Sequence, residues 1–575
     1  MADAFTLEIV KDKLAAAADE MGVVLARTSM SPIVYEVLDF ACGLTDERGQ
    51  VIAQANGLTL FTGTFGPQVR SVIEKFGLVG MRPGDVFATN VPYDGGTHTC
   101  DVCLVKPVFA GEAVVAFSVS VTHWIEIGGK VPGSIGPDAT EIFQEGLQLP
   151  CVRVYEAGSL AQTVVDLVRA NVRLPELAIG DLNAGVAAVT IGETRVREAC
   201  SRYGLGAVQE AFEATLDHGE RIARAELARI PNGVYRAEDA IDGDGLTEDD
   251  IPIEVTVTVS DEELSIDFTG CAQAARGPIN CTTGALHSAC KTVIRAITSP
   301  EARSNDGFFR PVTIVIPPGT VFSAESPSPT GWYYEGAAFA SELVWKALAP
   351  AVPGRLGAGS YTSLSVSYIV GTDTRDGTLF VHAEPNVGGW GADHDGDGES
   401  ALIATTDGDT YNYPVEVVET RFPVLVERYA LNTDGGGGAG TNRGGFGIVR
   451  EYQVLEEAAA ASGYGSMGGW RRRPWGLAGG RPGTHNFLEY RRAGKLRLRT
   501  GRVAHVPLEA GDLVTVFTGA GGGYGDPLER DPERVLADVL DGYLSPPQAL
   551  ADYGVVIGPD LRLDLEATRR ERSGR

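Results

Sequence analysis

The spacing of apolar residues predicts that the chain begins with an amphipathic helix and continues as a sheet. Across residues 7–25, apolar side chains recur every three or four positions, the period of one helix face, and Thr6 is placed to cap it. The pair Ser31-Pro32 stops this pattern because proline has no amide hydrogen for the helix. Short apolar runs then follow, separated by glycine-containing turns, and they indicate strands. The strands predicted here are residues 40–44, 51–54, 86–89, 102–109 and 113–122.

Helical periodicity returns across residues 174–227, and the turn sequence at 231–233 ends it. After this turn the chain mixes strands with glycine-containing loops. Two short helices are predicted near the end of the chain, at 531–540 and 546–552. The strands predicted in the middle of the chain are residues 253–260, 264–268 and 312–316.

We therefore expect an α+β protein of several domains, with mixed or antiparallel sheets, glycine-rich loops and flanking helices. A chain of 575 residues, of which 43% are hydrophobic, is long enough to form several cores. Its 73 glycines, many of them in short runs, permit tight turns and close backbone approach. The predicted domains are an N-terminal sheet-and-helix domain (1–232), a central β-rich domain (233–350), a glycine-rich α+β domain (351–530) and a helical tail (531–575).

The charge balance narrows the classes of partner. Acidic residues outnumber basic ones by 76 to 48, which gives a formal net charge of −28, so nucleic acid and anionic membranes are not expected partners. The sequence has no recognisable signal peptide or membrane-spanning run. Eight cysteines in so long a chain are too few for a disulfide scaffold, so we expect reduced thiols and a cytoplasmic location.

One cluster of polar residues has the composition of a metal site. His98 and Asp101 follow the glycine turn 93–96 and enter a predicted strand, and His123 ends the strand expected to pair with it. Such a hairpin brings two imidazoles and a carboxylate to one point, and this set binds Zn²⁺, Mn²⁺ or Fe²⁺ with positions left for water or substrate. The alternative is that both histidines only form hydrogen bonds in turns. Spacing alone leaves both interpretations open.

Other motifs carry weaker signals. Cys100 and Cys103 form a lone Cys-x-x-Cys, but residues three apart on a strand point to opposite faces and no second pair exists. The acidic loop 393–399 lacks the last glutamate of a calcium loop, so a cation site and a solvated turn remain alternatives. The glycine run 519–525 lacks the lysine of a phosphate-binding loop, so ATP is expected to bind elsewhere. Asp39 is either a carboxylate near the metal or an ordinary helix-end charge.

Short blocks from the first helix to residue 556 resemble the hydantoinase B/oxoprolinase family and follow its order. The N-terminal blocks are residues 38–42 (LDFAC), 90–98 (NVPYDGGTH) and 123–129 (HWIEIGG). The later blocks are residues 141–147, 267–270, 277–281, 414–419, 421–424, 444–447 and 522–527. The resemblance therefore covers nearly the whole chain.

The resemblance implies a partner subunit of the hydantoinase A type, which binds ATP-Mg and phosphorylates a lactam or enolate oxygen or bicarbonate. It implies that His98, Asp101 and His123 are the ligands of a metal. Two imidazoles and a carboxylate suit one divalent transition metal, Zn or Mn. This chain departs from many relatives at Trp124, where they have a second histidine, and at Glu126, where they have aspartate.

We therefore expect a subunit of an ATP-dependent hydrolase that acts on cyclic amides of the hydantoin, lactam or oxoproline type, within a hetero-oligomer. The metal would activate water against a carbonyl that the partner phosphorylates. Asp39 and Glu126 are candidate bases or supports for the ligands, and Trp124 is a candidate wall of a substrate pocket. Two alternatives remain: a subunit of an ATP-dependent ketone carboxylase, and a non-catalytic scaffold for the ATP subunit.

Overall fold

The N-terminal part of the chain is a seven-stranded antiparallel sheet. The structure, a computed structural model, describes residues 2–408 and 410–575. The strand order is β2-β1-β5-β4-β3-β6-β7, and each pairing in this order is antiparallel. The strands predicted at 51–54 and 86–89 have the expected bounds. The strands are β1 (Phe40–Asp46), β2 (Val51–Gln54), β3 (Val86–Thr89), β4 (Asp101–Ala110), β5 (Ala113–His123), β6 (Val152–Glu156) and β7 (Ser159–Leu160).

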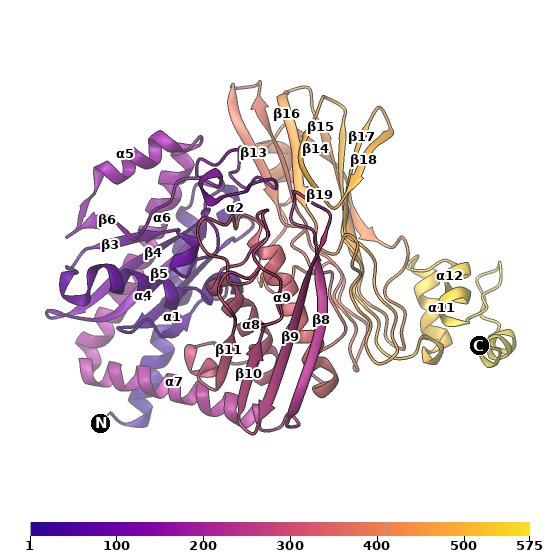
Figure 1. The fold of residues 1–575 in the computed structure, drawn as a ribbon, viewed down its shortest axis with the longest axis horizontal. Coiled ribbons are helices and arrows are strands. Elements are labelled where there is room, and N and C mark those ends of the chain that lie inside the picture. Colours follow the sequence, from indigo (N-terminus) through magenta and orange to yellow (C-terminus); the bar gives the residue numbers. More distant parts are fainter. Residues whose placement is uncertain (1, 409) are drawn as a thin grey trace.

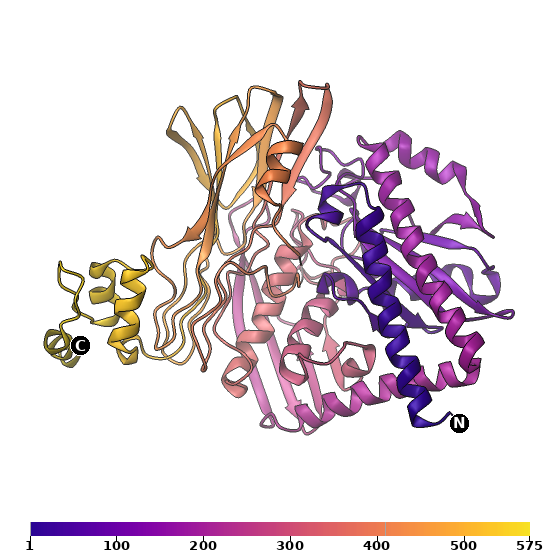
Figure 2. The same cartoon turned by 180° about the vertical axis from the view of Figure 1, so that it is seen from behind.

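Long helices cover one face of this sheet. α1 (Ala4–Thr28) and α6 (Pro175–Tyr203) lie side by side across it, and α7 (Leu205–Leu227) crosses beside them (Figure 2). The prediction that Thr6 caps α1 is wrong. Thr6 lies in the first turn, and its amide donates to the carboxylate of Asp3 at 3.0 Å, because an aspartate before the helix satisfies a free N–H group. The shorter helices of this part are α2 (Pro32–Tyr35), α3 (Thr59–Thr62), α4 (Phe65–Phe76) and α5 (Gln162–Asn171).

A second sheet, of four strands in the order β11-β10-β9-β8, carries two helices that the sequence did not predict. α8 (Thr283–Thr298) and α9 (Tyr333–Leu348) pack against each other, and α9 lies on β8 and β9 (Figure 1). Nearly every residue of α9 is buried, so no apolar stripe marks it as a helix in the sequence. The strands are β8 (Gly233–Asp242), β9 (Asp250–Ser260), β10 (Glu263–Asp267) and β11 (Val312–Val315), the last two being parallel.

Two antiparallel sheets form the upper lobe in Figure 1. Their orders are β13-β12-β16-β19 and β14-β15-β20-β17-β18, and α10 (Val415–Arg421) precedes β14. The strands are β12 (Val366–Asp373), β13 (Thr378–Glu384), β14 (Val424–Asn432), β15 (Gly447–Val454), β16 (Ala458–Ser466), β17 (Phe487–Arg492), β18 (Lys495–Thr500), β19 (Arg502–Pro507) and β20 (Leu513–Phe517). The predicted α+β class, with antiparallel and mixed sheets, is confirmed. The predicted domain boundaries stay a prediction.

Next to the upper lobe, backbone segments without regular strands stack into a layer. We call this the glycine layer and define it as residues 388–398, 437–445, 476–483 and 519–523. The Gly445 amide donates to the Trp390 carbonyl at 2.9 Å, and the Gly521 amide donates to the Gly445 carbonyl at 2.9 Å. A Cβ atom on Gly444 would lie 1.9 Å from the carbonyl oxygen of Gly521. The backbones thus approach more closely than any side chain permits, which explains the glycine runs.

The C-terminal helices project from one side of the molecule (Figure 1). The helices are α11 (Pro532–Leu540), α12 (Pro546–Tyr553) and α13 (Leu565–Ser573). The first two were predicted, whereas α13 was missed because its mostly charged sequence has no apolar stripe. The buried Arg530 donates to Asp397 at 2.6 Å and to Asp538 at 2.8 Å. One carboxylate of the acidic loop 393–399 is therefore held in an ion pair that fastens α11 to the glycine layer.

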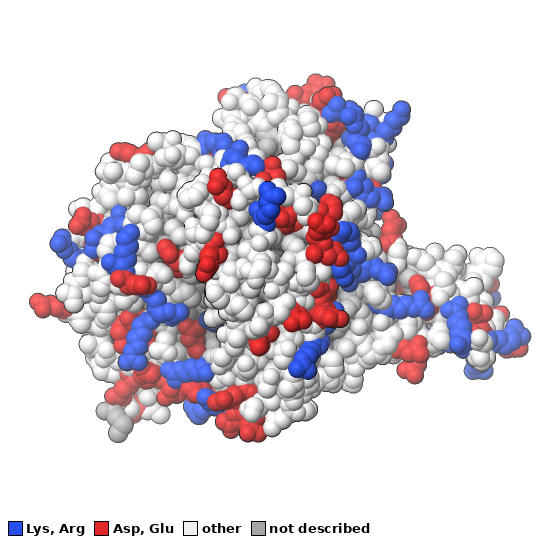
Figure 3. Space-filling model, viewed as in Figure 1, with Lys and Arg blue, Asp and Glu red and all other residues white. Residues whose placement is uncertain are grey.

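Charged side chains are spread over the surface. On the face shown in Figure 3, acidic and basic side chains are interspersed. Among residues 2–408 and 410–575, no helix is long and apolar enough to cross a membrane.

Candidate metal centre

The candidate centre lies at the open end of the β4–β5 hairpin. Asp101 begins β4 and His123 ends β5, and the two are paired in the antiparallel register. Directly opposite residues project from the same face of a sheet, so their side chains meet. A tight turn before β4, closed by the Asp101 amide donating to the His98 carbonyl at 3.1 Å, adds the second imidazole. The hairpin thus brings these three side chains together as its pattern predicted.

Three potential ligand atoms converge at this point. The Oδ1 atom of Asp101 lies 2.9 Å from His98 Nε2 and 2.9 Å from His123 Nδ1, and the two nitrogens are 3.3 Å apart. The exposed fractions are 2% for His98, 3% for Asp101 and 6% for His123. Among the described residues, this is the one group of three or more His, Cys, Asp or Glu side chains close enough to share a metal ion.

Further hydrogen bonds orient two of the potential ligands, His98 and Asp101, through the atoms that do not face the shared point. His98 Nδ1 lies 2.9 Å from the carbonyl of Gly331, which can only accept, so Nδ1 carries the hydrogen and Nε2 keeps its lone pair. Asp101 Oδ2 accepts from Thr97 Oγ1 at 2.5 Å and from Tyr333 Oη at 3.2 Å. Such outer contacts are typical of metal sites, because they orient the ligands. The three side chains therefore fit a divalent transition metal.

Burial and the two imidazoles act in opposite directions on Asp101. Burial raises the pKa of its carboxyl group, but the nearby His98 and His123 together outweigh burial and hold the pKa well below its usual range. The group is therefore an anion at neutral pH, which is the form that binds a cation.

The cluster opens into a small internal cavity, which we call the metal cavity. Its volume is about 40 Å³, which accommodates an ion with a few water-sized groups. The sequence did not predict five of the polar side chains on its wall, because they come from distant segments that carry no motif. These are Tyr333 and Tyr334 at the start of α9, Tyr368 in β12, Glu384 at the end of β13, and Asp407.

Two further carboxylates on the wall are buried and incompletely bonded. One oxygen of Asp39 and one oxygen of Asp407 have no hydrogen-bond partner among the described residues. Burial raises the pKa of Asp39 to about 8 and the pKa of Asp407 to about 7. The structure thus brings Asp39 to the cavity, as the sequence suggested, and adds Asp407.

Glu126 and Trp124 do not line the metal cavity. The carboxylate of Glu126 accepts from Arg173 Nη1 at 2.6 Å, from the Arg173 amide at 2.6 Å and from the Gly128 amide at 2.9 Å, so it holds the loop that follows β5. Trp124 is packed in the main hydrophobic core, and 2% of it is exposed. Their predicted roles as base and as substrate wall stay predictions. In the structure, Glu126 bonds the loop after β5 and Trp124 packs in the core.

Comparison with known proteins agrees with the sequence blocks. The family model described as Hydantoinase B/oxoprolinase matches residues 3–527. The B subunit of a putative D-/L-hydantoinase from Pseudomonas sp. (strain NS671) is 33% identical over 99% of this chain and 98% of its own length. The beta subunit of caprolactamase from Pseudomonas jessenii is 32% identical over 99% of both chains.

Two solved structures have the same fold. The crystal structure of the ATP-dependent caprolactamase from Pseudomonas jessenii superposes with a TM-score of 0.93, at 29% identity and over 100% of both chains. A nucleotide-free acetone carboxylase superposes with a TM-score of 0.93, at 21% identity, over 100% of this chain and 83% of the other. With matches that run almost from end to end, this chain belongs to the hydantoinase B/oxoprolinase family.

Proposed function

We propose that this chain is the metal-carrying subunit of an ATP-dependent hydrolase that opens cyclic amides. The observation that carries the proposal is the convergence of His98, Asp101 and His123 in a buried cavity. Relatives named as subunits of a hydantoinase and of a caprolactamase support the cyclic amide as substrate class. Their names also support a partner, which we propose is a hydantoinase A-type subunit that binds ATP-Mg and phosphorylates the substrate carbonyl.

The residues of the cavity have distinct tasks in this proposal. His98, Asp101 and His123 hold one divalent transition metal, Zn or Mn, which when bound would polarise a carbonyl and lower the pKa of a water ligand. Asp39 and Asp407 line the cavity, and each has one carboxylate oxygen without a partner. With a pKa of about 7, Asp407 is ionised in part at neutral pH and can accept a proton from water, whereas Asp39, with a pKa of about 8, is mostly protonated and can donate one. The Tyr333 hydroxyl donates to Oδ2 of Asp101, the carboxylate oxygen that does not face the two imidazoles.

Metal content tests the assignment of the ligands. We expect about one divalent transition metal per chain, since two imidazoles and one carboxylate suit Zn²⁺ or Mn²⁺ better than Ca²⁺ or Mg²⁺. Elemental analysis of protein purified without chelator measures this directly. Removal of the metal is expected to abolish ring opening, and added Zn²⁺ or Mn²⁺ to restore it. Full activity of metal-free protein would refute the site.

Reconstitution with the ATP subunit tests the reaction. The isolated chain is expected to hydrolyse no ATP, because it has no phosphate-binding loop with its lysine. In the complex, ATP turnover should rise when a hydantoin or lactam is supplied and should yield the ring-opened product. Turnover that requires a ketone and bicarbonate would favour the carboxylase instead. Full turnover after the metal has been stripped would favour the scaffold.

A further inference from the structure

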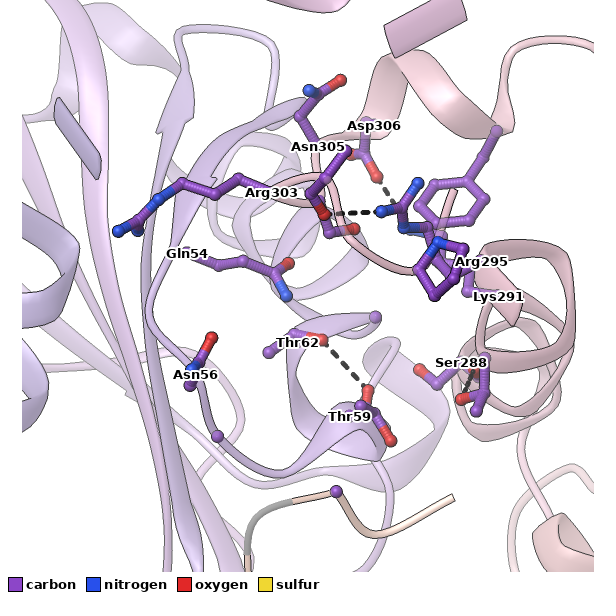
Figure 4. A pocket seen from close by; sticks show the side chains of 18 of the residues that line it. Gln54, Asn56, Thr59, Thr62, Ser288, Lys291, Arg295, Arg303, Asn305 and Asp306 are labelled. Atoms are coloured by element: carbon purple, nitrogen blue, oxygen red, sulfur yellow. Dashed lines mark hydrogen bonds and ion pairs between the residues drawn. The ribbon is translucent and has the colours of Figure 1, made fainter. Parts of the chain in front are cut away.

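A second and larger cavity lies on the far side of the wall that encloses the metal cavity. This outer cavity has a volume of about 340 Å³ and is bounded by α3, α8 and the loop 300–306 (Figure 4). The side chains that matter for its chemistry are Gln54, Asn56, Lys291, Arg295, Arg303 and Asp306. It is large enough for a small molecule.

The two cavities share a thin wall. In the single turn of α3 and the residue before it, Leu58 and Phe61 face the metal cavity, whereas Thr59 and Thr62 face the outer cavity. Asp407 lines the metal cavity, and its neighbour Gly408 lines the outer one. A molecule held in the outer cavity therefore lies one layer of backbone away from the candidate metal centre.

Arg295 contributes to the outer cavity a positive charge that no ion pair neutralises. Its Nη1 atom is buried without a hydrogen-bond partner, and no carboxylate among the described residues forms an ion pair with it. Its Nη2 atom donates to the carbonyls of Ser299 and Ala302, and its guanidinium lies 3.8 Å above the ring of Phe308. A buried cation without a counterion is costly, so an anion at this point would stabilise it.

Two of the other charged groups of the cavity are cations that are already paired, whereas the exposed Glu301, which also lines it, forms no ion pair among the described residues. Lys291 Nζ donates to Asp306 Oδ1 at 2.8 Å, and Arg303 pairs with Asp19 at 2.9 Å. The Lys291 ammonium has three hydrogens, so it keeps donors for a ligand beside its bond to Asp306. Arg295 therefore supplies the unpaired positive charge, and Lys291 supplies a second cationic donor.

The neutral groups complete a site that donates hydrogen bonds. The hydroxyls of Thr59, Thr62 and Ser288 donate to backbone carbonyls, so they have no hydrogen left for a ligand. Gln54 and Asn56 extend amide groups into the space, as Figure 4 shows. The donors that remain include two cationic groups and the amides of Gln54 and Asn56, a combination that suits an oxyanion.

We propose that the outer cavity binds an oxyanion, the phosphate or carboxylate group of a small molecule, with Arg295 and Lys291 as its principal donors. The source of the oxyanion rests on the proposed function, because ATP-dependent opening of a cyclic amide releases both inorganic phosphate and a new carboxylate. Binding itself does not depend on that reaction. The wall formed by α3 and residues 407–408 then separates the oxyanion from the metal.

Calorimetric titration of the metal-loaded chain with inorganic phosphate, and separately with 6-aminohexanoate, tests the proposal. Binding of phosphate alone or of 6-aminohexanoate alone would identify the ligand group. Both Arg295→Gln and Lys291→Gln are expected to weaken binding at least tenfold. Arg303→Gln is the matched control, since this rim arginine already pairs with Asp19 and should leave the affinity unchanged.

Several results would overturn the oxyanion site. Binding of neither ligand by the wild-type chain would do so, as would unchanged affinity in both Arg295→Gln and Lys291→Gln. Arg295 also bonds two carbonyls near the end of α8, so its substitution can affect folding, and the melting temperature of the variant must be measured. Lys291→Gln provides an independent measurement of the change in affinity. Loss of phosphate binding in His123→Ala would place the anion at the metal instead. Oxyanion binding without any ring-opening activity would leave this site standing while the proposed function fails.

Discussion

Replacing His123 with alanine is expected to remove the bound metal and to lower the rate of ring opening by more than about 100-fold. Loss of a residue that only contacts a metal ligand already lowers metal affinity or activity by about 10–100-fold, so loss of a ligand itself should have a larger effect. The imidazole contributes one of three converging ligand atoms, and two ligands do not hold a transition metal tightly. The side chain ends a strand and faces a cavity, so the chain should still fold. The measurements are metal content, melting temperature and turnover of the variant complexed with its ATP subunit.

His505→Ala is the matched control for this variant. His505 is an exposed histidine of β19 whose ring bonds Ser462 on the neighbouring β16, in a sheet other than that of the hairpin. It should keep both metal and activity. If His123→Ala binds metal and turns over like the wild type, His123 is a structural histidine and the proposed centre is wrong.

Substitution of Gly444 by alanine is expected to destabilise the fold by roughly 3 kcal/mol, the upper part of the range for forced overpacking. The added Cβ would lie 1.9 Å from the carbonyl oxygen of Gly521, and both backbones belong to the glycine layer, so neither yields easily. A shift in the midpoint of urea unfolding measures the effect.

Gly206→Ala is the control for this substitution. Gly206 lies at the start of α7 with nothing within 4 Å of an added Cβ, so alanine should leave stability unchanged or raise it by up to about 1 kcal/mol. Equal unfolding midpoints for Gly444→Ala and wild type would mean that the glycine layer is loosely packed, contrary to its geometry.

Local patterns in the sequence predicted the hairpin and therefore the cluster. β4 and β5 are neighbours in the chain, so the turn and the alternation of side chains were sufficient to place Asp101 opposite His123. The sequence left the position of Asp39 open, because the pairing of β1 with β5, which brings it to the cavity, joins segments far apart in the chain. The metal role of Asp101 and His123 stays a prediction, but their proximity follows from short-range rules.

The rest of the cavity could not be predicted because its parts meet only in the folded chain. Tyr333 comes from a helix that is buried on nearly all sides and so lacks a periodic stripe. Asp407 lies in an irregular loop where an Asp-Gly pair normally indicates only a turn. Arg295 resembles any basic residue in the last turn of a helix, and its missing counterion is visible only in three dimensions.

The order in which the centre is assembled has a consequence for the growing polypeptide. The three candidate ligands are complete at residue 123, whereas α9 and Asp407, which close the cavity over them, follow 210 to 284 residues later. At roughly 5–20 residues per second, ribosomal synthesis of that interval takes about 10–60 s. During this time the hairpin exists without the segments that bury it, so its imidazoles and carboxylate are open to ions in the surrounding solution before the finished fold encloses them.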